Sequence, residues 1–139
     1  MEAWAREFLD VWQANRDRIA DTMLRAIADN PHLPVKYTRE DVMQIFDGVR
    51  AMAEEALLGQ STELREMYMD TVLPSMFAGG QPIGALAGQV VINAMLLQSV
   101  LIPAMSAENG EKAATFFRNF YCKICMDSVR LGIEQGGKP

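Results

Sequence analysis

The sequence predicts an all-α protein, a single domain of about five main helices. Apolar residues recur at steps of three, four or seven along most of the chain, the spacing of one helix face. No stretch shows the strict apolar-polar alternation that is typical of strands. In addition, no charged side chain occurs from Thr71 to Ala107, although 22% of all residues are charged. We expect this neutral stretch to contain the helix around which the rest of the fold packs.

Two helices are expected in the first part of the chain. The first is long and ends before Asn30. Residues 31–35 then form a stiff connector, because its prolines lack a backbone donor and push their predecessors out of the helical conformation. Thr38 is a suitable N-cap for the second helix, Asp41 places negative charge in its first turn, and Gly59 closes it.

Three further helices are expected after Gly59. The third covers residues 62–78 and is bent by Pro74, because a proline inside a helix removes one hydrogen bond and clashes with the preceding turn. Its inward stripe is expected to consist of Leu64, Met67, Tyr68, Val72 and Met76. The fourth begins at Pro82 and runs to Pro103, and the last follows Asn109-Gly110. The domain thus covers residues 1–135, and residues 136–139 form a C-terminal tail or the start of a linker.

The neutral fourth helix raises the question of a membrane span. The segment from Ile83 to Met105 has the required length of about 20 mainly apolar residues. However, it contains the polar side chains of Gln89 and Asn93, and no basic residues flank it to set a topology. We therefore expect a core helix and no membrane span.

A domain of this size rarely surrounds one helix completely, so we expect a second copy to cover part of it. The chain is predicted to form a homodimer. The residues proposed for the dimer interface are Leu97, Leu101, Phe117 and Ile124.

Composition and motifs exclude several function classes. The formal net charge of -5, without a basic stripe, argues against a nucleic-acid partner. The charged N-terminus does not resemble a signal segment, so we expect a cytoplasmic protein. His32 is the only histidine, and Cys122 and Cys125 are interpreted as small buried hydrophobic residues, so no metal site is expected. No catalytic motif is present, and we expect no enzymatic activity and no cofactor.

An apolar ligand pocket is the alternative to an ordinary core. The ten methionines and the aromatic residues could line such a pocket, although stripes of this spacing are more often core. The pocket would lie near Tyr68, Met76 and Phe120.

The segment from Met76 to Leu86, in which Gly79-Gly80-Gln81-Pro82 opens a long apolar helix, carries a resemblance to a known family. With the long aromatic first helix and the proline-rich connector, it resembles the N-terminal sensor domains of RsbR-type stressosome proteins. These are similar to the globin domains of globin-coupled sensors. The resemblance implies a globin-like helical domain without haem, dimeric through its last helices, that passes a stress signal to a downstream domain. Where haem-binding relatives carry their proximal histidine, this chain has Met76.

We therefore expect a non-enzymatic signalling module. A ligand or partner would favour one of two packings of the last two helices, and the helix ending near Gln135 would transmit that change to a downstream domain or partner protein. The alternative is a small-molecule sensor or carrier that binds haem or another apolar ligand in its pocket.

Overall fold

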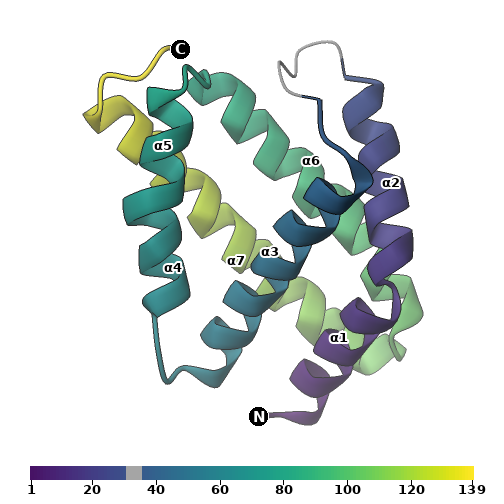
Figure 1. Ribbon diagram of the computed structural model, residues 1–139. Coiled ribbons are helices and arrows are strands. Elements are labelled where there is room, and N and C mark those ends of the chain that lie inside the picture. The colour runs from purple at the N-terminus through teal and green to yellow at the C-terminus, as the bar shows by residue number, and fades with distance from the viewer. Residues whose placement is uncertain (31–35) are drawn as a thin grey trace.

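The computed structural model describes residues 1–30 and 36–139, and these residues form helices and connecting turns, with no strand among them (Figure 1). The elements are α1 (Ala3–Ala14), α2 (Arg16–Ala28), α3 (Arg39–Leu58), α4 (Glu63–Met67), the π-helical turn η1 (Tyr68–Val72), α5 (Leu73–Ala78), α6 (Ile83–Leu101), the 3₁₀ turn η2 (Ile102–Ala104) and α7 (Ala107–Glu134). The predicted all-α class is confirmed. The connector predicted at 31–35 lies outside the described residues.

The expected single first helix is instead divided into α1 and α2 at Asn15. The side-chain amide of Asn15 donates to the carbonyl oxygen of Val11 at 2.8 Å, and its backbone N–H donates to the same oxygen at 3.0 Å. Asparagine competes in this way with regular helical bonding, and the backbone at Asn15 leaves the helical conformation. The apolar spacing alone did not reveal this break.

The core lies where α1, α2, α3, α6 and α7 meet, and it is rich in aromatic rings. Phe8, Trp12 and Phe117 are at most 2% exposed. The rings of Phe8 and Trp12 meet edge to face with centroids 5.6 Å apart, and Phe8 meets Phe117 in the same manner at 5.8 Å. In this edge-to-face geometry the quadrupoles of the two rings attract each other, and this attraction adds to the stabilisation from the buried apolar area.

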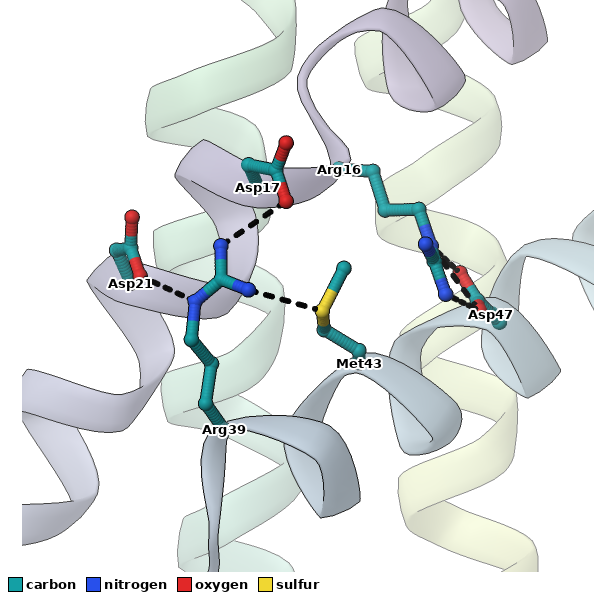
Figure 2. A network of polar contacts seen from close by, with 6 residues as sticks. All are labelled: Arg16, Asp17, Asp21, Arg39, Met43 and Asp47. Carbon is teal, nitrogen blue, oxygen red and sulfur yellow. Dashed lines mark hydrogen bonds and ion pairs between the residues drawn. The ribbon is translucent and has the colours of Figure 1, made fainter.

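Ion pairs join α2 to α3 at the surface (Figure 2). Arg39 donates to Asp21 at 2.8 Å and to Asp17 at 2.9 Å. About two turns further along α3, Asp47 accepts three hydrogen bonds from Arg16, the shortest at 2.6 Å. These pairs are about half exposed, so they fix how α3 lies on α2 more than they add stability.

The predicted ends of the second helix are confirmed in α3. The Thr38 hydroxyl accepts from the backbone N–H of Asp41 at 3.1 Å, and the Asp41 carboxylate accepts from the backbone N–H of Thr38 at 2.9 Å. This reciprocal capping box satisfies two backbone donors at the helix start. At the other end, Gly59 has a φ of 65°, the left-handed conformation that glycine adopts without strain.

The third predicted helix is not a single bent α-helix, because α4 and α5 are joined by the π-helical turn η1. Pro74 has no N–H to give to the previous turn and its ring crowds the carbonyl four residues back. The chain accommodates the proline by widening the turn before it, and the N–H of Leu73 reaches five residues back to the carbonyl of Tyr68. We call residues 63–78 the α4–α5 arm.

The last helix begins earlier than predicted. Helix α7 starts at Ala107, so Gly110 lies inside it rather than before it. A Cβ on Gly110 would lie 3.4 Å from the carbonyl oxygen of Ile102, so the missing side chain lets α7 approach η2 closely. At the opposite end, a Cβ on Gly132 would lie 2.8 Å from Ile83 and 2.9 Å from Phe77. Small residues therefore set the close packing of α7 against α5 and α6.

The C-terminal tail lies against the start of α6. The carbonyls of Lys138 and Pro139 accept hydrogen bonds from the N–H groups of Ile83 and Gly84 at 2.8 and 2.9 Å. These two donors at a helix start have no partner within the helix. The tail therefore caps α6 and connects its first turn to the end of α7.

Helix α6 is only partly covered by its own chain. Val90 and Leu97 are buried, as expected for a core helix, but Val91 and Met95 are 50% and 66% exposed. The segment Ile83–Ala104 has the length and hydropathy of a membrane span, with a mean hydropathy of 1.8, and 28% of its most apolar window is buried. The sequence predicts a helix around which the rest of the fold packs. The chain itself covers α6 only in part.

Candidate functional site

An apolar cavity of about 410 Å³ lies between the α4–α5 arm, α3, α6 and α7. Its volume falls within the usual range for small-molecule sites, roughly 300–1,000 Å³. The α3 wall includes Ile45, Phe46, Val49 and Met52, the arm provides Leu64, Met67, Tyr68, Val72 and Met76, and α6 and α7 provide Leu86, Gln89, Val90, Asn93, Tyr121 and Ile124. In Figure 1 the arm stands at one side of the fold, next to α3 and α7.

The arm forms a wall of this cavity and does not pack tightly on the core. All the residues predicted to form its inward stripe line the cavity. Yet Met67 and Val72 are 54% and 39% exposed, and Leu73 is the only fully buried residue of the arm. The stripe therefore faces inward, as its spacing predicts, but it faces open space. Met67, Val72 and the 42% exposed Ile45 surround the opening toward solvent.

Polar contacts fix the N-terminal end of the arm. The Glu55 carboxylate at the end of α3 accepts from the backbone N–H groups of Leu64 and Arg65 at 2.9 and 3.2 Å. The Arg65 guanidinium pairs with Asp127 of α7, which also accepts from Arg130 at 3.0 Å. The Asp127 side chain is 17% exposed, so the pair with Arg65 is partly shielded from water. These contacts hold the arm at a distance from α3 while leaving the space between them open.

Two buried polar atoms of the lining have no hydrogen-bond partner. They are the hydroxyl of Tyr121 and the side-chain carbonyl oxygen of Gln89. The Gln89 amide nitrogen is already used, since it donates to Asn93 Oδ1 at 2.6 Å. Tyr121 is 5% exposed and lies in the interior part of α7. A buried polar group without a partner costs about 1–3 kcal/mol, so such groups are rare unless something else binds them.

The electrostatics of the cavity favour neutral species. None of the lining residues that the structure describes is charged. Burial raises the pKa of Tyr121 far above its usual range, with a smaller contribution from the neighbouring Tyr68. Burial also raises the pKa of Tyr68, and a hydrogen bond with Ser128 offsets part of this increase. Both phenols are therefore neutral near pH 7.

The predicted pocket residues are only partly brought together. Tyr68 and Met76 both line the cavity. Phe120 does not: its ring stacks on Phe116 with centroids 5.7 Å apart, on the side of α7 that meets α1. The inclusion of Phe120 was wrong because one helical step separates it from Tyr121, and that step turns the side chain toward a different neighbour.

The residues predicted for the dimer interface lie inside the single chain. Leu97, Leu101 and Phe117 are 0% exposed, and Ile124 is 6% exposed and faces the cavity. Their area is already buried by contacts within the monomer, so it is not available to a second copy. The sequence could identify these side chains as buried. It could not show whether the same chain or a second copy buries them.

The predicted absence of a metal site concerned His32, Cys122 and Cys125. His32 lies outside the described residues. In the part of the chain that the structure describes, no cluster of histidine, cysteine, aspartate or glutamate has the arrangement of a metal site. Cys122 is exposed, contrary to its interpretation as a buried residue, and burial raises the pKa of the half-buried Cys125 thiol. A raised pKa disfavours the thiolate, so Cys125 has no feature of a reactive cysteine.

Sequence reasoning missed Gln89 and Tyr121 as site residues. A usable signal was present for Gln89, because Gln89 and Asn93 are one turn apart on an otherwise apolar helix, where unpaired amides are costly. For Tyr121 there was none, since a tyrosine within an aromatic stripe resembles any core residue.

Comparison with protein-family models, curated proteins and solved structures finds no match to this chain. The geometry described above is therefore the basis for a functional proposal.

Proposed function

We propose that this protein is a sensor domain that binds a small, mainly apolar molecule in the cavity behind the α4–α5 arm. The observation that carries the proposal is the cavity of about 410 Å³, lined by apolar side chains and by the unpartnered Tyr121 hydroxyl. A folded domain packs its interior closely, and an apolar space of this size weakens it unless a ligand fills it. Sensing, rather than catalysis, is favoured because the lining residues that the structure describes include no charged acid, base or nucleophile.

The path from ligand to output runs through α7. Tyr121 and Ile124 of α7 line the cavity, and Asp127, one turn further on, holds the arm through Arg65. A ligand that moves the arm therefore acts on α7, whose end is joined to α6 through the tail. We infer that occupancy shifts the packing of α6 on α7 and that this shift is passed to a downstream or partner domain.

The test uses the neutral fluorophore 1-aminoanthracene and a pair of identical substitutions. Val49→Phe fills part of the cavity, whereas Val91→Phe adds the same ring to the exposed side of α6. We expect the wild type and Val91→Phe to bind the fluorophore with similar affinity, and Val49→Phe to bind it at least tenfold more weakly. Equal affinity for all three proteins, or no binding to the wild type, would contradict the proposal.

A second proposal concerns dimer formation, and the exposed face of α6 and α7 favours it. Gly84, Gly88, Val91 and Met95 form an uncharged exposed stripe on α6. On α7, which packs on α6, Met126 and Ile133 are 67% and 66% exposed. We propose that a second copy covers the exposed stripe of α6, in place of the interface predicted from the sequence, because exposed apolar patches mark interaction surfaces.

Sedimentation velocity at micromolar concentration tests this second proposal. The wild type is expected to sediment as a dimer and Met95→Lys as a monomer. Met67→Lys, which places the same charge on the arm, is the control and is expected to remain dimeric. A monomeric wild type, or a protein that disperses only in detergent, would refute it.

A further inference from the structure

The polar atoms of the cavity restrict the chemistry of its ligand, an inference that rests on the proposed function. Three facts are decisive: the unpartnered oxygen of Gln89, the unpartnered hydroxyl of Tyr121, and the absence of charge among the described lining residues. The first and the third each remove a class of ligand, and the second is a further group with which the ligand can form a hydrogen bond.

Gln89 selects for a hydrogen-bond donor. Its amide nitrogen donates to Asn93 Oδ1 at 2.6 Å. The side-chain carbonyl oxygen of Gln89 is an acceptor to which no group donates. A carbonyl oxygen cannot donate, so a ligand satisfies it only with an O–H or N–H group. Hydrocarbons, ethers and ketones leave it unpaired.

Tyr121 accepts either kind of partner. Its hydroxyl can donate to a ligand oxygen or accept from a ligand N–H. The residue is 5% exposed, and its buried hydroxyl has no hydrogen-bond partner within the fold. A ligand hydroxyl is the smallest group able to donate to Gln89 or to exchange hydrogen bonds with Tyr121.

Charged ligands are disfavoured by the lining. A carboxylate in the cavity would lose its water and meet no cation, because the described lining carries no arginine, lysine or histidine. An ammonium group would likewise meet no carboxylate. We propose that the ligand is an uncharged amphiphile, with a hydrocarbon body along the walls formed by α3 and the arm and an O–H or N–H group directed at Gln89 and Tyr121.

The experiment compares probes of similar size that differ in their polar group. They are 1-octanol, which donates and accepts; 1-methoxyheptane, with the same number of heavy atoms but no donor; and octanoate, which is charged. Each competes with 1-aminoanthracene for the full-length protein. We expect 1-octanol to compete on the order of tenfold better than the ether, the loss associated with one unpaired buried group. Octanoate is expected to compete weakest, and lengthening the alcohol to strengthen binding about fourfold per added CH₂.

Variants assign this selectivity to the named atoms. Gln89→Met keeps the length of the side chain and removes the acceptor, so the alcohol and the ether should then differ by no more than about twofold, because neither leaves an unpaired acceptor. Tyr121→Phe should weaken the binding of 1-octanol on the order of tenfold. Gln44→Met is the matched control, since Gln44 also lines the cavity but is exposed, and it should leave the ratio unchanged.

Each outcome has a separate meaning. If the ether competes as well as the alcohol, or octanoate competes better, the inference on ligand class is wrong while the cavity remains a binding site. The inference is also overturned if Gln44→Met abolishes the selectivity and Gln89→Met does not. If neither 1-aminoanthracene nor any of the three probes binds, the proposed function fails, and the inference fails with it.

Discussion

Replacing the buried Tyr121 of the cavity with phenylalanine should stabilise the ligand-free protein. The Tyr121 hydroxyl is buried and has no hydrogen-bond partner, and such a group costs about 1–3 kcal/mol. Tyr121→Phe removes the hydroxyl and keeps the ring, which packs on Phe117 with centroids 4.7 Å apart. We expect a gain of about 1 kcal/mol in the free energy of unfolding, the lower end of that range.

The assay is equilibrium unfolding in urea, followed by circular dichroism, on protein refolded from urea so that any small molecule carried through purification has been removed. The slope of the free energy against urea should stay unchanged, because both proteins expose the same surface on unfolding. Tyr68→Phe is the matched control. The Tyr68 phenol interacts with the Ser128 side chain, an interaction that lowers its pKa, so removing the Tyr68 hydroxyl should cost about 0.5–1.5 kcal/mol. If Tyr121→Phe proves as destabilising as Tyr68→Phe, the Tyr121 hydroxyl has a partner and the reasoning about the cavity is refuted.

Two further outcomes follow from the packing and from the buried phenols. Gly132→Ala should destabilise the protein by about 1–3 kcal/mol, because the new Cβ would lie 2.8 Å from Ile83. In Gly48→Ala the new Cβ has no neighbour within 4 Å, so this control should gain up to about 1 kcal/mol in the free energy of unfolding. Both values are measured by urea unfolding, and equal effects of the two substitutions would contradict the reasoning. The folded-state pKa values of Tyr68 and Tyr121 lie above the unfolded value of 10.0, so ionisation of these phenols costs no stability below pH 10, and the protein loses stability as the pH rises above 10. In a Tyr37→Phe background, phenolate absorbance should therefore appear together with the loss of helical circular dichroism, and phenolate formation in the folded protein would show that these phenols are accessible.

Several local features could be predicted from the sequence because nearby residues decide them. Thr38 and Asp41 cap α3 through atoms three residues apart, and Gly59 ends the same helix by its own backbone freedom. The inward stripe of the arm was also predicted, since a face is set by helical spacing. Where a local competitor was overlooked, as at Asn15, the prediction was wrong.

The candidate site was less predictable, because it is a space between elements distant in sequence. Tyr68 and Met76 line the cavity, but Gln89 and Tyr121 reach it from α6 and α7, and nothing local distinguishes an unpaired hydroxyl from a paired one. Similarly, the sequence marked Leu97 and Phe117 as buried, but burial by the same chain and burial by a partner leave the same pattern.

The sequence by itself determined the helical class, most helix ends and which face of each helix is apolar, because spacing, caps and prolines act over a few residues. Only the tertiary structure decided that the arm stands away from α3 instead of closing on it. That distance depends on the turn widened before Pro74, on Glu55 and Asp127 holding the arm at one end, and on the tight contact at Gly132 at the other. The turn is local, but the contacts at Asp127 and Gly132 join residues far apart in the chain, and together these features leave the cavity that apolar spacing alone would have filled.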